Sequence, residues 1–214
     1  MGKLDHLPGV FITGTDTEIG KTYVSSLIIR ELRKKKIDAV GLKPVCSGSR
    51  KDAQALYLAN EEVLDLDVVN PWCFRAPLAP LTAGRIEGES LQLDKVVSQI
   101  NHVRVNHQFT LIEGVGGWMV PMGEGFGIAE FAKELALPIV VVVGNRLGAI
   151  NHTLLTVEAI LAARLECLGV ILNYPQAERD LAATTNRLIL EELCPVPILG
   201  EVITDAPEIE WNDC

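Results

Sequence analysis

Aromatic residues and long hydrophobic runs are scarce in this sequence. Aromatic residues make up 5% of the 214 residues. No uninterrupted apolar run reaches the roughly 18 residues that a membrane-spanning helix needs. Residues 1–6 also lack a basic head followed by an apolar core, so they do not resemble a signal peptide. From these absences we expect a cytoplasmic protein with no membrane association.

Positive charge is in deficit as well. The chain has 19 Lys and Arg against 28 Asp and Glu, which gives a net charge of −9. An acidic chain is a poor partner for nucleic acid, so we expect none to bind. With 48% apolar residues the chain can bury a sizeable core. No linker, repeat or low-complexity tract divides it, and we expect a single domain over residues 1–214.

A cysteine pattern for disulfides or zinc is also missing. The five cysteines are odd in number and show no C-x-x-C spacing: Cys46, Cys73, Cys167, Cys194 and Cys214. This usage predicts reduced thiols in a cytosol-like compartment. We interpret Cys46 as a small packing residue.

The most informative feature that the sequence does contain is a glycine-bounded loop ending in Gly-Lys-Thr. It follows the apolar residues 10–12 and precedes a helical pattern, which is the context of a phosphate-binding loop. Backbone N–H groups and the helix N-terminus attract phosphate, the lysine adds a full charge, and the threonine offers a hydroxyl to Mg²⁺. We therefore predict nucleotide binding by Gly14, Thr15, Asp16, Thr17, Glu18, Ile19, Gly20, Lys21 and Thr22.

Predicted strands and helices alternate along the rest of the chain. Short apolar runs predict strands at 10–13, 38–42, 109–112, 138–143, 169–172 and 196–199. Helical periodicity predicts helices at 21–35, 52–58, 90–103 (with Ser90 as its cap), 128–135, 149–165 and 179–193. Residues 71–80 carry four prolines and predict an irregular connection, and residues 205–214 predict a loose tail. The pattern is typical of an α/β three-layer sandwich with a mostly parallel central sheet, of the P-loop NTPase type.

Ligands of such sheets bind beyond the C-terminal ends of the strands, so the residues that follow each strand are candidates for the site. Lys43 follows the second strand and can neutralise an anionic substrate. Glu113 follows the strand at 109–112 and can hold Mg²⁺ together with Thr22 and Asp52. Each has a plainer alternative: Lys43 as an exposed turn residue, Glu113 as a buried acid at a strand end, and Asp52 as the N-cap of the next helix.

Five segments in a fixed order resemble the dethiobiotin synthetases, ATP-dependent carboxylases of biotin synthesis. The segments are residues 14–22, 43–48, 52–53, 113–117 and 147–152. The five residues between the loop glycines, where the usual pattern has four, make this resemblance more specific than a generic phosphate loop. It extends over residues 11 to about 202.

The resemblance implies a reaction and a set of roles. The family converts 7,8-diaminopelargonic acid, CO2 and ATP into dethiobiotin, ADP and phosphate, through a carbamate and a carbamic–phosphoric anhydride. Lys21 would hold the γ-phosphate, Lys43 would neutralise the carbamate, and Thr17 and Ser47 would touch the diamine or carbamate. Mg²⁺ would be bound by Thr22, Asp52 and Glu113.

The resemblance also implies contacts outside the phosphate loop. The adenine of ATP would lie near Asn173, Gly200, Glu201 and Val202. Family enzymes are homodimers, and the substrate carboxylate would be bound across the subunit boundary by Gly148, Ala149, Ile150 and Asn151.

Two other functions fit parts of the sequence. A cobyrinate-amidating enzyme would need an added glutaminase domain, for which 214 residues leave no room. A nucleotide-switched binding ATPase of the partition or targeting type would share the phosphate loop. It would leave Lys43 and residues 147–152 without an obvious role.

Overall fold

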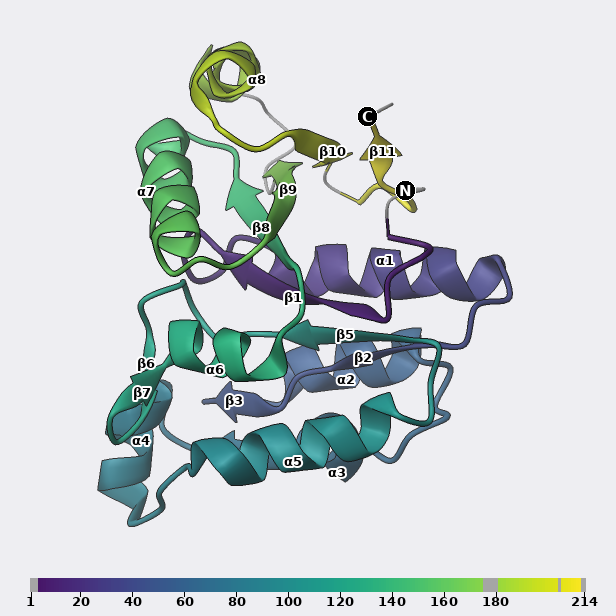
Figure 1. The fold of residues 1–214 in the computed structure, drawn as a ribbon, viewed down its shortest axis with the longest axis vertical. Coiled ribbons are helices and arrows are strands. Elements are labelled where there is room, and N and C mark those ends of the chain that lie inside the picture. Colours follow the sequence, from purple (N-terminus) through teal and green to yellow (C-terminus); the bar gives the residue numbers. More distant parts are fainter. Residues whose placement is uncertain (1–3, 175–180, 204, 213–214) are drawn as a thin grey trace.

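A central sheet of seven strands organises the chain (Figure 1). The computed structural model of the protein describes residues 4–174, 181–203 and 205–212. The strands lie in the order β2-β5-β1-β8-β9-β10-β11, and every neighbouring pair is parallel except β10 and β11. Their bounds are β1 Gly9–Gly14, β2 Ala39–Leu42, β5 Phe109–Glu113, β8 Ile139–Gly144, β9 Cys167–Tyr174, β10 Ile198–Ile203 and β11 Glu210–Trp211. The predicted mostly parallel sheet is confirmed.

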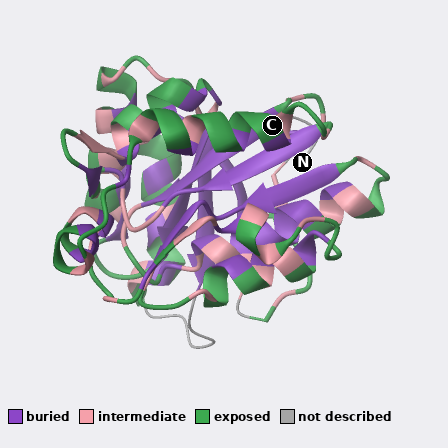
Figure 2. Cartoon of the chain, turned by 90° about the horizontal axis from the view of Figure 1, so that it is seen from below, coloured by how far each residue is buried: buried purple, intermediate pink, exposed green. Residues whose placement is uncertain are grey.

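Helices cover both faces of this sheet. The described helices are α1 Lys21–Lys34, α2 Lys51–Ala59, α3 Leu66–Val69, α4 Pro80–Glu87, α5 Leu93–Arg104, α6 Ile128–Leu135, α7 Ala149–Ala162 and α8 Leu181–Leu193. Apolar residues of α5, α6, α7 and α8 form one core with the sheet, and those of α1 form a second core on the opposite face. Figure 2 shows the buried strands between partly exposed helices. Among the described residues, no helix is both long and apolar enough to cross a membrane.

Strand β8 shows why the sequence selects a parallel sheet. Its first five residues, 139–143, are all fully buried. Successive side chains point to opposite faces, so Val141 and Val143 enter one core while Val140 and Val142 enter the other. A continuous β-branched run satisfies both cores at once, as a central parallel strand requires.

The proline-rich stretch contains more regular structure than the sequence predicted. Strand β4 Trp72–Phe74 pairs in parallel with β3 Val45–Ser47, and helix α4 begins at Pro80. Proline is compatible with the first turn of a helix, because the N–H that it lacks would have no helical partner there. A second small sheet pairs β6 Pro121–Gly123 with β7 Phe126–Gly127.

Two further local predictions were wrong. Helix α5 starts at Leu93 with Gln92 as its N-cap residue, so Ser90 does not cap it. Leu91 precedes the helix and is buried in the core. The described part of the C-terminal segment is docked, because β11 extends the sheet and Trp211 Nε1 donates to Glu31 Oε2 at 2.7 Å.

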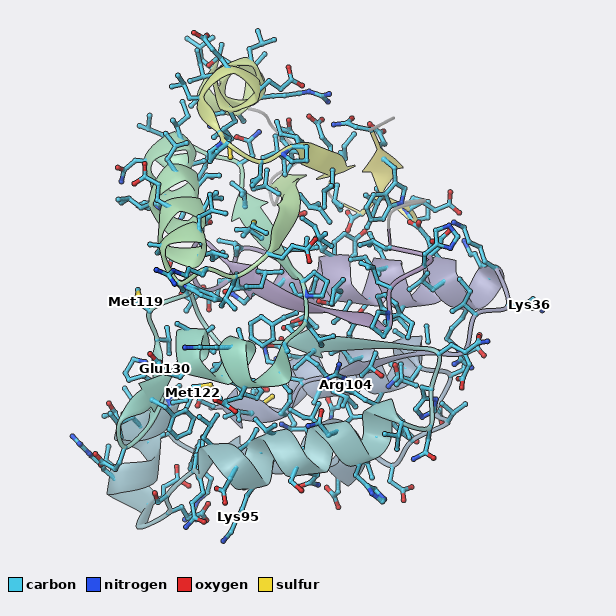
Figure 3. All side chains as sticks on the ribbon, in the orientation of Figure 1. Lys36, Lys95, Arg104, Met119, Met122 and Glu130 are labelled. Carbon is cyan, nitrogen blue, oxygen red and sulfur yellow. The ribbon has the colours of Figure 1, made fainter. Side chains whose placement is uncertain are left out.

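Side chains fix several helix ends near the sheet (Figure 3). Glu130 accepts a hydrogen bond from the Gly127 N–H at 2.8 Å and so holds the start of α6. Arg104, at the end of α5, donates to the Leu135 carbonyl at 2.9 Å and ties α5 to α6. These contacts fix the start of α6 and join its end to α5.

The strand register brings Glu113, Lys43 and the start of the phosphate loop to one edge of the sheet. Ile12 of β1 lies opposite Glu113 of β5, and Leu42 of β2 lies opposite Ile112. Lys43 therefore follows β2 at the level of Glu113. Because β5 lies between β1 and β2, the side chain of Glu113, the last residue of β5, lies between the phosphate loop and Lys43.

Candidate active site

The phosphate loop, residues 14–22, connects β1 to α1 as predicted. Gly20 is the N-cap residue of α1, and its φ of 89° lies in the left-handed region. A Cβ at Gly20 would come within 2.1 Å of the Asn173 amide nitrogen, so any larger residue would displace that side chain and would also have to adopt a left-handed conformation. Lys21 folds back over the loop, and its Nζ donates to the Asp16 carbonyl at 2.7 Å. The sequence Gly-Lys-Thr thus produces the strand, loop and helix geometry that cradles phosphate.

Glu113 joins the phosphate loop to Lys43. Its Oε1 accepts hydrogen bonds from Thr22 Oγ1 at 2.7 Å and from Lys43 Nζ at 2.6 Å. Lys43 Nζ also donates to the Gly114 carbonyl at 2.9 Å and lies 3.4 Å from Asp52 Oδ2. Glu113 and Lys43 are 1% and 3% exposed. The alternative of Lys43 as an exposed turn residue is therefore wrong.

Asp52 lies in the first turn of α2, and Arg50 occupies the N-cap position. The alternative of Asp52 as the N-cap is therefore wrong. Its carboxylate is half exposed and turns toward Lys43. A half-exposed carboxylate beside a buried ammonium is accessible to another cation as well.

The two lysines carry opposite pKa shifts. Burial and the nearby charge of Lys43 lower the pKa of Lys21 to about 8. Burial also disfavours the charged form of Lys43, but the carboxylates of Glu113 and Asp52 outweigh it and raise the pKa of Lys43. The carboxylates thus favour the charged form of Lys43, whereas the lowered pKa brings the titration of Lys21 close to neutral pH.

Both lysines line one cleft of about 830 Å³. Thr17, Ser47, Asp52 and Glu113 line it as well, and residues 77–80 form part of the wall. The Ser47 hydroxyl is buried and has no hydrogen-bond partner among the described residues. The cleft therefore combines two ammonium groups, the carboxylates of Glu18, Asp52 and Glu113, and hydroxyls that can receive a polar ligand.

The oxygen atoms around Glu113 fit a hard divalent cation such as Mg²⁺. Glu113 Oε2 is buried without a partner among the described residues, Thr22 Oγ1 donates to the other oxygen of the same carboxylate, and Asp52 lines the same cleft. Within the described ranges no group of three or more His, Cys, Asp or Glu residues is placed to hold a metal. A small number of protein ligands is enough for Mg²⁺, because the ion usually keeps several water molecules and also binds substrate phosphates.

Cys46 lines the cleft beside Lys43 and is buried. Burial raises the pKa of its thiol to about 12, although the charge of Lys43 acts in the opposite direction. The group stays a protonated thiol at neutral pH, in agreement with its interpretation as a packing residue.

Some residues assigned by resemblance lie away from this cleft. Helix α7 begins after Gly148, whose φ is 91°, and Gly148, Ala149, Ile150 and Asn151 do not line the cleft. Leu147 beside them is 82% exposed. Arg146 bridges back to the phosphate loop, with its Nη2 at 3.1 Å from Asp16 Oδ2.

The residues assigned to adenine are held by protein contacts. Asn173 is buried, and its side-chain amide donates to the Ile19 carbonyl at 2.8 Å. Glu201 pairs with Arg187 at 2.7 Å, Val202 is fully buried, and Gly200 lies opposite Trp211 of β11. Their contact with a base stays a prediction.

Sequence reasoning missed the buried amide of Asn70 and its partner Arg50. Asn70 donates to the carbonyl of Lys43 at 2.7 Å, and Arg50 Nε donates to Asn70 Oδ1 at 3.0 Å. A neutral residue on a connection carries no motif, and the contact joins positions far apart in the sequence. The only available signal was the position of Asn70 directly before a proline in an otherwise apolar stretch.

Comparison with known proteins agrees on one family. A family model described as an AAA domain matches residues 8–208. The chain is 45% identical over 192 residues to an ATP-dependent dethiobiotin synthetase of Akkermansia muciniphila, with 90% of each chain covered. It is 38% identical to that of Bacillus subtilis strain 168, covering 90% of this chain and 85% of the relative. It is 36% identical to that of Endomicrobium trichonymphae, covering 95% and 96%.

Solved structures confirm the fold class. The signal recognition particle receptor FtsY of Elizabethkingia anophelis matches with a TM-score of 0.61 at 10% identity, over 96% of this chain and 60% of that chain. The cell division protein MinD of Aquifex aeolicus matches with a TM-score of 0.56 at 15% identity, over 92% and 82%. A ParA family ATPase of Chlorobium tepidum matches with a TM-score of 0.55 at 12% identity, over 92% and 85%. At these identities the likeness establishes the P-loop type of fold alone.

Proposed function

This chain belongs to the ATP-dependent dethiobiotin synthetases, and we propose that its cleft closes the ureido ring of dethiobiotin from 7,8-diaminopelargonic acid and CO2 with the conversion of ATP to ADP and phosphate. It is an ATP-dependent ligase of biotin biosynthesis. The observation that carries the proposal is the placement of Lys21 and Lys43 in one cleft, on either side of Glu113.

The reaction brings two anions together. One amine of the substrate captures CO2 as a carbamate and loses a proton. A carbamate oxygen then attacks the γ-phosphorus of ATP and releases ADP. The second amine attacks the carbonyl carbon of the resulting anhydride, closes the ring and expels phosphate. The attack is slow in water, because carbamate and triphosphate repel each other; fixed cations remove that repulsion.

The two lysines divide this work. Lys21 lies over the phosphate loop, so it binds the outer phosphates and stabilises the charge that moves toward ADP. Lys43 lies beyond Glu113 in the same cleft and neutralises the carbamate. Its raised pKa supports this role, because the lysine stays charged at the pH at which a carbamate persists.

Thr22, Glu113 and Asp52 would hold Mg²⁺, which supplies charge neutralisation of the phosphates when bound. Thr17 and Ser47 would contact the diamine or the carbamate. The exposed position of Thr17 and the unpaired hydroxyl of Ser47 support that assignment. The remaining loop residues 14–20 would bind phosphates through their backbone N–H groups.

We also propose that the enzyme is a homodimer of single-domain subunits. Residues 148–151 lie outside the cleft of their own chain, as expected if they bind the substrate carboxylate of a partner subunit. Asn173 and residues 200–202 would lie near the adenine. Dilution below the dimer dissociation constant should abolish turnover, and a monomer with full activity would contradict the shared site.

Mass spectrometry of the product tests the reaction itself. The protein, incubated with the diamine, ¹³C-bicarbonate and Mg·ATP, should give dethiobiotin with one ¹³C and one ADP per product. A nucleotide-switched ATPase is the second candidate, because MinD and ParA share the fold. ATP hydrolysis at an equal rate without the diamine would favour the switch and contradict the ligase.

A further inference from the structure

We propose that Asn70 and Arg50 are positioning residues that hold Lys43 and the start of α2 as one unit, and thereby set how Lys43 and Asp52 face each other in the cleft. This inference rests on the proposed function, since it concerns the cation that neutralises the carbamate. It adds two residues that do not line the cleft themselves.

Consecutive residues at the end of α3 hold both backbone polar groups of Lys43. The Lys43 N–H donates to the Val69 carbonyl at 2.9 Å, and the Lys43 carbonyl accepts from Asn70 Nδ2 at 2.7 Å. The same amide reaches the carbonyls of Pro44 at 3.3 Å and Trp72 at 3.0 Å. Pro44 has no N–H of its own, and its carbonyl also accepts from the Trp72 N–H at 3.1 Å, so the Asn70 side chain supplies the donor for the buried Lys43 carbonyl.

Arg50 holds Asn70 from the other side. Its Nε donates to Asn70 Oδ1 at 3.0 Å, and its Nη2 donates to the Asn70 backbone carbonyl at 2.8 Å. Asn70 is 1% exposed, and these bonds fix its orientation: a guanidinium only donates and the carbonyls only accept. The planar fork of arginine makes the two contacts from one rigid group, which a lysine ammonium could not reproduce.

The contacts form a closed circuit. Arg50 is the N-cap residue of α2, and Asp52 follows in the first turn. The Asp52 carboxylate returns to Lys43 Nζ at 3.4 Å. Asn70 thus fixes the backbone of Lys43. The ammonium of Lys43 lies beside the carboxylate of Asp52, and the helix that carries Asp52 is preceded by Arg50 as its N-cap residue. Because effective attack requires reacting groups in place to a fraction of an ångström, loosening this circuit should slow chemistry without weakening ATP binding.

Two substitutions break the circuit and one serves as a matched control. Asn70→Asp keeps the acceptor for Arg50 and removes the donor to Lys43, and Arg50→Lys keeps the charge and removes the fork. We expect kcat for dethiobiotin to fall about tenfold in Asn70→Asp and about fivefold in Arg50→Lys, with the ATP dissociation constant changed less than about twofold. Asp67→Asn removes only the exposed ion pair of Arg50 and should leave kcat unchanged.

A double-mutant cycle separates positioning from general destabilisation. In the Lys43→Gln background, followed by single-turnover product formation, Asn70→Asp and Arg50→Lys should cost less than about twofold, because the group that they position is gone. Equal losses in both backgrounds, or unchanged kcat in both single variants, would overturn the inference. If Asn70→Asp fails to fold, Arg50→Lys alone decides, because that side chain is partly exposed. A wild-type protein that forms no dethiobiotin would instead refute the proposed function.

Discussion

The two halves of the sheet rim hold their polar residues in different ways. At the ends of β1, β5 and β2, the buried polar residues that line the cleft are charged: Lys21, Lys43 and Glu113. Beyond β8 and β9 the buried polar residues are amides, Asn145 and Asn173, joined by Asn186 of α8. The charged residues contact one another and line the cleft, whereas the amides bind the backbone of neighbouring loops.

This difference assigns chemistry to one half and support to the other. Asn145 donates to the Ala183 carbonyl at 3.0 Å, and Asn186 donates to Asn145 Oδ1 at 2.8 Å and to the Arg146 carbonyl at 3.0 Å. Neutral amides with good hydrogen bonds stiffen loops and do not titrate. Buried charges are costly, and they persist here because each has a partner that a substrate can replace.

The largest expected effect is loss of the charge in the phosphate loop. Lys21→Ala should lower kcat/KM for ATP by at least about 10³-fold, since a preorganised cation acts on the transferred phosphate in a site with little water. Product formation under saturating diamine and bicarbonate measures this. Activity within tenfold of wild type would place the essential charge elsewhere.

The second lysine should affect chemistry and spare nucleotide binding. Lys43→Gln removes the carbamate partner but leaves the phosphate loop intact, so kcat should fall about 10²-fold while the ATP dissociation constant by calorimetry changes less than about twofold. Lys36→Gln is the matched control, because Lys36 is exposed and lies past the C-terminal end of α1, whereas the phosphate loop is at the N-terminal end of that helix (Figure 3). A parallel loss of ATP affinity in Lys43→Gln would show that both lysines serve the nucleotide.

The charged half should also respond to pH. The pKa of Lys21 is lowered to about 8, so its ammonium is lost as the pH rises through that value. Because kcat/KM reports the free enzyme, its value for ATP should be about tenfold lower at pH 9 than its plateau below pH 7. The Lys21→Arg variant, slower overall, should lack this alkaline limb, since arginine does not titrate there. A limb of equal position in that variant would assign the titration to another group.

The charged half was also the half that the sequence predicted well. Lys21 lies in a motif, and Lys43 and Glu113 end two apolar runs, so the rule that parallel strands place their ends on one rim was enough to bring them together. The uninterrupted apolar residues of β8 and the periodicity of α6 were equally plain, and α6 was predicted to the residue. The hydrophobic pattern of each segment predicts these strands and this helix, and the common direction of the parallel strands predicts that their ends meet.

The amide contacts could not be predicted in the same way. Asn173 binds the Ile19 carbonyl across 154 positions, and Asn70 reaches Lys43 across 27. A hydrogen bond of this kind leaves no periodicity and no charge pattern, because it depends on tertiary geometry alone. The short strands β3 and β4 were missed for a related reason: each is stabilised by pairing with a distant strand, and prolines nearby suggested an irregular chain.

The smallest expected effect tests the supporting half through Asn173. Asn173→Ala leaves the buried Ile19 carbonyl without its donor, which should cost about 1–3 kcal/mol in the free energy of unfolding. The loosened loop should raise KM for ATP by about three- to fivefold while kcat at saturation stays within about twofold, because no charge is removed.

Asn186→Ala is the matched control for that variant. It removes the donors to Asn145 and to the Arg146 carbonyl but no direct contact of the phosphate loop, and the Arg146–Asp16 pair that links the two is exposed, so the variant should lose similar stability with less than about a twofold change in KM for ATP. The comparison also tests the adenine contact that the resemblance implies for Asn173. If Asn173→Ala weakens ATP more than about 100-fold while GTP binding is unaffected, the amide recognises the base directly and the supporting half also carries specificity.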